Sequence, residues 1–92
     1  MLELSNNKIT SIDLLKNLTR LYVLGLSNNQ IDDLDAVRNL TGLFGLILNK
    51  NQIKNIDALR NLNELYLLDL SWNQVRSIDS LKILNEMIKI ND

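Results

Sequence analysis

The feature that most constrains the fold is a repeat of 22 residues that runs along the whole chain. Four asparagines mark it, because Asn7, Asn29, Asn51 and Asn73 stand 22 residues apart. Large aliphatic residues fill the same positions around each asparagine, and four such units account for nearly all of the 92 residues. The sequence therefore predicts one domain over residues 1–92, built as a stack of about four like units that pack against one another.

The spacing of the apolar residues predicts the structure of each unit. Between two strands they recur at every third position, as in Ile31, Leu34, Val37, Leu40, Leu43 and Leu46. An α-helix turns by about 100° per residue, so such a row would drift around it, whereas a backbone with about three residues per turn keeps the row on one side. The period changes to two at Leu24-Gly25-Leu26, which is typical of a strand. Each unit is predicted to hold one short strand and a tightly wound return, long enough to connect parallel strands.

These residues carry a family resemblance. The segment Leu21-x-x-Leu24-x-Leu26-x-x-Asn29-x-Ile31 resembles the leucine-rich repeat signature, and it recurs over residues 43–53 and 65–75. The longer form of the repeat, which ends in Ile-Asp-x-Leu-x-Asn-Leu over residues 56–62, is similar to the 22-residue class of bacterial internalins and of protein phosphatase regulatory subunits. This chain lacks the proline that internalins usually carry in the return segment. The resemblance implies an α/β solenoid, a right-handed superhelix. Short parallel strands would line its concave face, and 3-10 or short helical turns its convex face.

Two polar columns have structural interpretations. A sharp turn after each strand leaves backbone amides and carbonyls inside the solenoid, and an asparagine side chain offers both a donor and an acceptor for them. We therefore expect the asparagine column to be structural. A second column is expected to cap the short turns of the return segment, with a basic residue three positions after each aspartate. It consists of Asp13, Asp35, Asp57 and Asp79, followed by Lys16, Arg38, Arg60 and Lys82.

Composition excludes several classes of function. The chain has no cysteine and no histidine, so disulfides, thiolate sites and imidazole chemistry are excluded, and we expect no enzyme, no catalytic residue, no metal and no cofactor. A net charge of −1 argues against a nucleic-acid partner. No stretch resembles a membrane span or a signal peptide, so we expect no membrane partner. The compartment is left open, and would be cytoplasmic if the chain is complete.

Residues that alternate with the buried leucines are predicted to face solvent on the concave sheet. They include a diagonal row of three aliphatic residues, Val23, Ile47 and Leu67, with aromatic neighbours, and we expect this surface to bind another protein. The expected contact residues are Tyr22, Val23, Phe44, Ile47, Tyr66, Leu67, Asp69 and Trp72. Alternatively, the three aromatics spaced by 22 residues simply stack on one another. Gly25 and Gly45 would leave dents beside them, which a partner side chain fills or which only weaken the sheet.

The outer units have apolar edges and no clear caps, with residues 79–87 expected to form at most a weak terminal helix. The chain is therefore expected to be a fragment of a longer array or to associate end to end with itself. The favoured function is a protein–protein interaction module that binds its partner on the concave sheet. The alternatives are an incomplete or architectural repeat fragment without a partner of its own, and a regulatory subunit of an enzyme such as a phosphatase.

Overall fold

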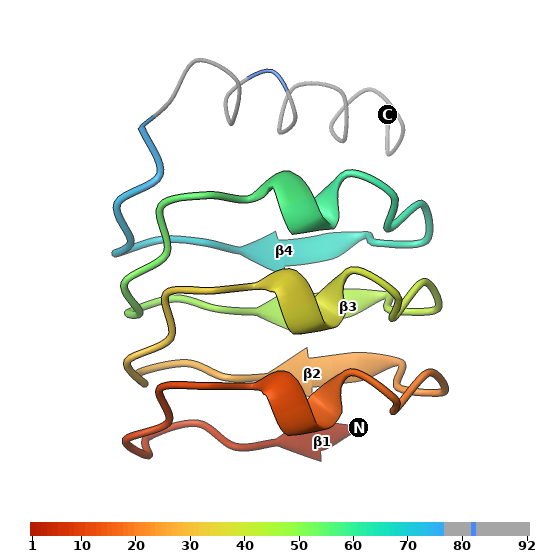
Figure 1. Cartoon of the computed structure of the whole chain (residues 1–92), viewed down its shortest axis with the longest axis horizontal. Coiled ribbons are helices and arrows are strands. Elements are labelled where there is room, and N and C mark those ends of the chain that lie inside the picture. Colours follow the sequence, from red (N-terminus) through yellow and green to blue (C-terminus); the bar gives the residue numbers. More distant parts are fainter. Residues whose placement is uncertain (77–81, 83–92) are drawn as a thin grey trace.

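The computed structural model describes residues 1–76 and Lys82, and within them the chain winds as a stack of similar coils (Figure 1). Each coil has a strand on one side, and the first three coils have a 3-10 turn on the other. The strands are β1 (Leu2–Glu3), β2 (Val23–Gly25), β3 (Gly45–Ile47) and β4 (Leu67–Asp69). The turns are η1 (Asp13–Leu15), η2 (Asp35–Val37) and η3 (Asp57–Leu59). We call the two sides the sheet face and the turn face.

The four strands form one parallel sheet in the order β1-β2-β3-β4. The register matches each residue with the one 22 positions later, so that Leu24 lies beside Leu46 and Leu46 beside Leu68. Equivalent side chains of successive coils therefore stack directly on one another. The predicted parallel sheet of short strands is confirmed.

The return segments explain the three-residue period of the sequence. In the second coil the amide of Val37 donates to the carbonyl of Leu34, that of Leu40 to Val37, and that of Leu43 to Leu40, at 3.0 to 3.1 Å. The same three bonds recur in the first and third coils. Each bond spans three residues, so the apolar side chains that make them return to one side of the backbone. The 3-10 turns expected opposite the strands are confirmed.

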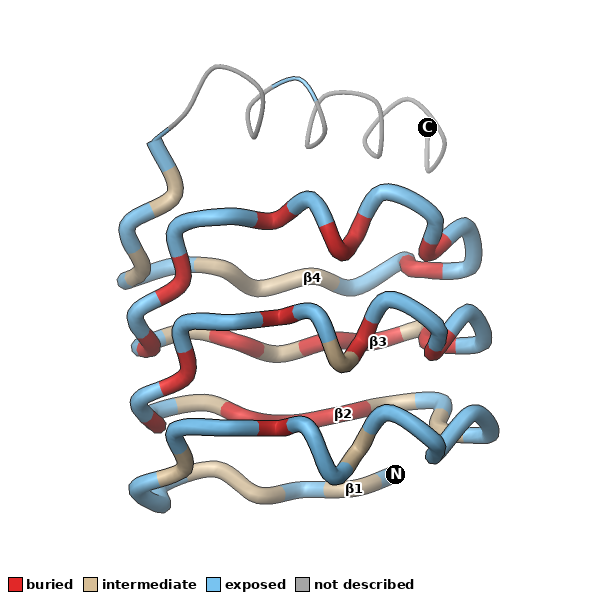
Figure 2. The backbone as a smooth tube through the Cα atoms, viewed as in Figure 1, coloured by how far each residue is buried: buried red, intermediate tan, exposed pale blue. Residues whose placement is uncertain are grey.

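The core is the space between the sheet and the return segments. Leucine and isoleucine side chains of the second and third coils fill it, and Leu24, Leu46, Ile31 and Ile53 are fully buried. In Figure 2 the buried residues concentrate in these inner coils, while the residues of β1 and β4 are half-buried or exposed. Close packing of the same side chains in successive coils stabilises the stack, since neighbouring coils share each buried layer.

The expectation that the aspartate column caps the turns is wrong for the three aspartates described. The capping positions are Ile12, Leu34 and Ile56, and no side chain of theirs caps the turn. These positions are taken by aliphatic residues because their side chains fill the core. The aspartates stand one residue later, where the carboxylate points outward. Asp79, and the terminal helix expected over residues 79–87, lie outside the described residues apart from Lys82.

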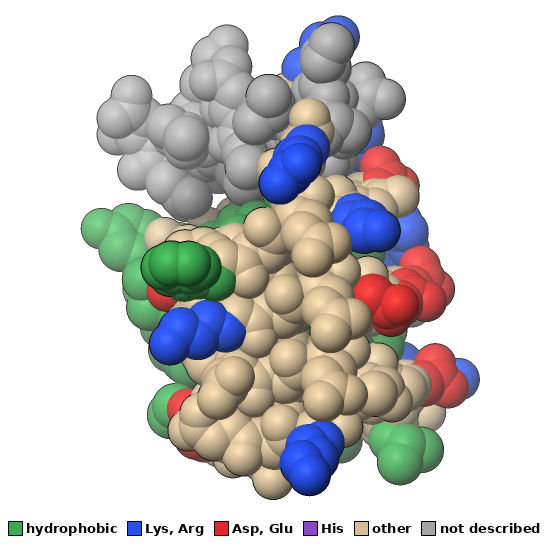
Figure 3. All heavy atoms as spheres, turned by 90° about the vertical axis from the view of Figure 1, so that its left-hand side faces the viewer, with side chains coloured by type: hydrophobic (Ala, Val, Ile, Leu, Met, Phe, Trp, Pro, Cys, Tyr) green, Lys and Arg blue, Asp and Glu red, His purple; other side chains and the backbone are tan. Residues whose placement is uncertain are grey.

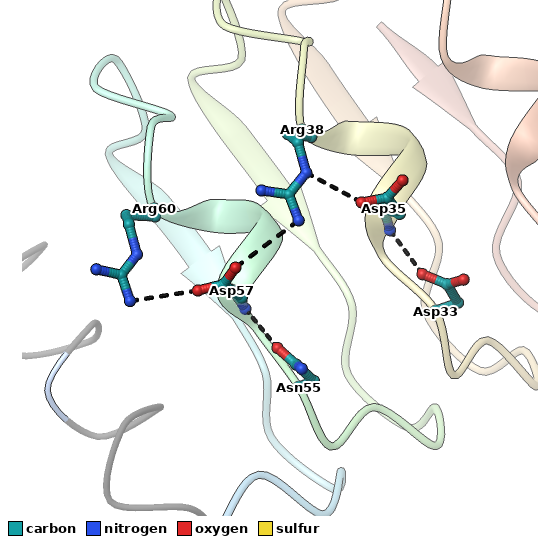
Figure 4. A network of polar contacts seen from close by, with 6 residues as sticks. All are labelled: Asp33, Asp35, Arg38, Asn55, Asp57 and Arg60. Atoms are coloured by element: carbon teal, nitrogen blue, oxygen red, sulfur yellow. Dashed lines mark hydrogen bonds and ion pairs between the residues drawn. The ribbon is translucent and has the colours of Figure 1, made fainter.

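The outward aspartates instead form ion pairs with the basic residues three positions on. Arg38 Nε lies 3.0 Å from Asp35 and Arg60 Nη2 lies 3.2 Å from Asp57. Arg38 also reaches Asp57 of the next coil at 3.8 Å, so the pairs form a chain along the turn face (Figure 4). Such exposed pairs contribute about 0 to 1 kcal/mol each.

Among the helices of the described part, none has the length and apolarity to cross a bilayer.

Candidate protein-binding face

The turn that follows each strand is built around the repeated asparagine. Asn51 Oδ1 accepts from the amide of Ile31 at 3.0 Å, and its Nδ2 donates to the carbonyls of Leu26 and Leu48 at 2.9 and 3.0 Å. Ile31 and Leu26 belong to the preceding coil and Leu48 to its own coil. The residue is 7% exposed, so its side chain satisfies backbone groups in the interior. Asn29 and Asn73 make the equivalent bonds.

Asn7 differs from the other three. Its Nδ2 donates to the carbonyls of Leu4 and Ser5 in its own coil, and the residue is exposed. Its amide donates to Oδ1 of Asn29 at 3.2 Å, so it receives a link from the second coil. The side chain of Asn7 therefore bonds its own coil only, and the link between the first two turns comes from the side chain of Asn29.

Three aromatic rings form a continuous stack at the entry to the strands. The rings of Tyr22 and Phe44 have centroids 5.1 Å apart and an interplanar angle of 9°, and those of Phe44 and Tyr66 are 5.2 Å apart at 14°. The outer two residues are exposed and Phe44 is half-buried between them. The stacking alternative is thus observed, yet the two outer residues of the stack remain exposed beside the sheet.

The remaining expected contact residues divide into two groups. Leu67 is 52% exposed and Trp72 is 78% exposed. Val23, Ile47 and Asp69 are only half-buried positions, so the aliphatic diagonal is not the fully exposed row that was expected. The exposed apolar surface therefore concentrates at the fourth strand and at the aromatic stack.

Neighbouring side chains of the same chain cover the two strand glycines. A Cβ atom on Gly45 would meet Val23 at 3.4 Å, and one on Gly25 would meet the carboxylate of Glu3 at 2.5 to 2.8 Å. The expected dents are therefore filled from the preceding strand, because a glycine lets that side chain lie flat across the sheet. This contact also explains why Val23 is half-buried.

Acidic groups of the sheet face are engaged by serines two residues later. The Glu3 carboxylate accepts from both the amide and the hydroxyl of Ser5, and the Asp69 carboxylate accepts from those of Ser71 at 3.0 and 2.7 Å. The hydroxyl bond, followed by the amide bond, lowers the pKa of Glu3 below its ordinary value of 4.5. Both carboxylates are thus held by serines of their own coils.

The turn face has a hollow of about 700 Å³ between the second and third coils, and it offers no catalytic constellation. Charged residues line part of it, including Asp33, Asp35, Arg38 and Asp57. Figure 4 shows how these groups satisfy one another, with the Asp35 amide also bonded to Asp33 and that of Asp57 to Asn55, both at 2.8 Å. Within the described ranges, acidic side chains form no group of three that could hold a metal ion.

Comparison with known proteins agrees with this geometry. A family model for leucine-rich repeats, in two copies, matches residues 1–39. Two solved structures from Listeria monocytogenes cover 88% of this chain: an internalin (inlF), with a TM-score of 0.79 and 38% identity, and an internalin C2 (inlC2), with a TM-score of 0.84 and 37% identity. No curated protein sequence gives a significant match.

The chain is therefore a leucine-rich repeat protein, and its solenoid is internalin-like. Its 92 residues span 24% of the first of those two chains and 36% of the second. Leucine-rich repeat domains generally bind proteins. The predicted resemblance to leucine-rich repeats and to internalins is confirmed.

Proposed function

We propose that this chain is a protein-interaction module, not an enzyme, and that it binds its partner on the sheet face. The observation that carries the proposal is the exposed apolar surface formed by the aromatic stack together with Leu67. Exposed apolar groups that lie together are typical of protein-binding sites, and aromatic residues are enriched in them. The internalin-like fold supports the same class of function.

The proposed contact residues surround β4. Tyr66 and Leu67 enter this strand, Asp69 ends it, and Trp72 follows in the next turn. The other two rings of the stack contribute Tyr22 and Phe44. Val23 and Ile47 lie on β2 and β3 and would form the floor of the contact, since both are half-buried.

The test uses two leucines that are both exposed but lie on opposite faces. Leu67 is on the sheet face, whereas Leu14 lies on η1 of the turn face and is 95% exposed. Partners are captured with the tagged wild-type chain and compared quantitatively with Leu67→Ser and Leu14→Ser. We expect Leu67→Ser to lose a partner that Leu14→Ser retains. Equal recovery by both variants would reject the sheet face.

The same experiment separates the narrower functions. If the partner lost with Leu67→Ser is an enzyme, such as a phosphatase, its activity measured with and without the chain decides whether the chain is a regulatory subunit. If no captured protein depends on Leu67, the architectural fragment is favoured instead.

End-to-end self-association is a separate proposal with its own observation. Leu2, Leu4 and Ile9 on the outer side of the first coil are half-buried, while their counterparts in the next two coils are fully buried. A second copy would cover this side. We expect the mass from light scattering to rise with concentration, and to rise less for Leu2→Glu. A constant monomeric mass at high micromolar concentration would reject the proposal.

A further inference from the structure

One position of the repeat has an unusual backbone conformation in all four coils. Asn6, Asn28, Lys50 and Trp72 have φ angles of 62°, 56°, 60° and 60°, in the left-handed region. Asparagine adopts this conformation readily because its short polar side chain bonds nearby groups, and Asn28 Nδ2 indeed donates to Asn6 Oδ1 at 3.0 Å. Lysine and tryptophan have no such compensation. Because all four coils share this conformation, the change of residue type is what sets the third and fourth coils apart.

The lysine and the tryptophan lie on consecutive turns. The amide of Lys50 donates to the carbonyl of Ser71 at 2.9 Å, so the backbone before Trp72 stacks on that of Lys50. Lys50 is exposed and Trp72 is 78% exposed. An indole ring carries a large apolar area that proteins usually bury. The fold thus places an ammonium group and an exposed indole on neighbouring coils, at the edge next to the end of β4.

The charges around this edge are unbalanced. Lys8, Lys50 and Lys54 form no ion pair with any carboxylate of the described residues, whereas Lys16, Arg38 and Arg60 of the turn face all do. Asp69, the carboxylate that ends β4, is held by Ser71. Figure 3 shows this edge, with basic side chains distributed over it and the larger group of acidic side chains at the margin near the turn face.

From these observations we infer that Lys50 and Trp72 together bind an acidic segment of a protein partner. A carboxylate of the segment pairs with the Lys50 ammonium, and an adjoining apolar side chain packs on the Trp72 ring. The inference rests on the proposed function, since it gives the chemistry of the part of the partner that passes from the sheet face to this edge. An acidic peptide fits better than an anionic membrane, because the apolar element is one ring beside one cation.

The test exploits the fact that Trp72 is the only tryptophan of the chain. Its fluorescence is followed while the full chain is titrated with a synthetic peptide of alternating glutamate and leucine, and with a matched peptide that has lysine in place of glutamate. We expect a saturable change with the acidic peptide, weakened by salt, and none with the lysine peptide. Lys50→Asn should weaken binding about tenfold, because it removes a charge-assisted contact.

Lys8→Asn is the matched control, since it removes a cation from the same edge but from the first coil. Trp72→Asn, followed with a fluorescently labelled peptide, should weaken binding as well. Equal affinity for the two peptides, or equal effects of Lys50→Asn and Lys8→Asn, would overturn the inference. A response to vesicles of anionic lipid without a response to the acidic peptide would overturn it in favour of a membrane.

Failure of this inference is distinguishable from failure of the sheet face. If Leu67→Ser loses a captured partner while Lys50→Asn does not change peptide affinity, the sheet face stands and the acidic segment is rejected. If Lys50→Asn weakens peptide binding but Leu67→Ser retains every partner, the edge binds and the sheet face does not.

Discussion

Two neighbouring columns of the repeat lie in the same turn, but one keeps a single residue type in every coil and the other does not. In the first column every unit has asparagine, at positions 7, 29, 51 and 73. In the second column, one residue earlier, asparagine gives way to Lys50 and Trp72 while the left-handed φ angle hardly changes. The first column bonds backbone groups inside the solenoid, and the second projects its side chains into solvent.

The difference shows which physical requirement keeps the residue type constant along a column. A buried amide or carbonyl must find a partner, and at Asn29 and Asn51 only a side chain with both donor and acceptor supplies it in that turn. The second column has to satisfy only a backbone conformation, which several residues adopt at a modest cost in free energy. Its side chains are therefore free to vary with function.

The largest expected effect comes from removing an asparagine of the first column. Asn51→Ala leaves the amide of Ile31 without its partner and removes one of the two asparagine donors from each of the carbonyls of Leu26 and Leu48, so the free energy of unfolding should fall by more than about 1 kcal/mol. Asn7→Ala should cost less, because Asn7 is exposed. Urea denaturation of both variants measures the difference. Equal midpoints, or a neutral Asn51→Ala, would contradict the structural role of this column.

A smaller effect of opposite sign is expected in the second column. Lys50→Asn places the favoured residue in the left-handed conformation, and should raise the free energy of unfolding by about 0.5 to 1 kcal/mol. The reverse substitution, Asn28→Lys, is the matched control and should lower it by a similar amount, with the bond to Asn6 also lost. Thermal melts of the two variants measure this pair of shifts. A lower melting temperature for Lys50→Asn would show that the conformation carries no penalty for lysine.

Most of the fold could be predicted because its signals are periodic. The three-residue spacing of Leu34, Val37 and Leu40 predicts the same residues that make the 3-10 bonds, and the 22-residue shift predicts the register of the sheet. The aspartates were wrongly predicted to cap the turns. Each capping position lies one residue earlier, where the core requires an aliphatic side chain. Sequence spacing alone does not show that Leu34 must fill the core at that position.

The candidate face was harder to predict than the fold. Leu67 and Trp72 were found by their departure from the repeat and Tyr66 by the recurrence of aromatic residues at its position, and all three are exposed. The covering of Gly25 by Glu3 was missed, because it depends on how a side chain crosses to the next strand. Lys50 was missed as well. Its φ angle matches those of the other residues of its column, so only the change from asparagine to lysine sets it apart from the first two coils.

The smallest expected effect concerns a third column of the same turn, which consists of Ser5, Ser27, Asn49 and Ser71. Ser5 and Ser71 each bind the carboxylate two residues before them. At the same position of the second and third coils, the Ser27 hydroxyl donates to the Asn49 side chain and so joins the two coils. The pKa of Glu3 is lowered mainly by the Ser5 hydroxyl, so Ser5→Ala should move it back towards 4.5, with the amide bond retaining part of the shift. A carboxyl whose pKa is lowered by folding adds stability above its unfolded pKa, and loses it as the pH falls through the folded value. Chemical shifts of the Glu3 side chain, titrated by NMR in both proteins, measure the two pKa values. If Glu3 titrates alike in both, the serine hydroxyl does not hold the carboxylate, and this column would be as free to vary as the one that contains Trp72.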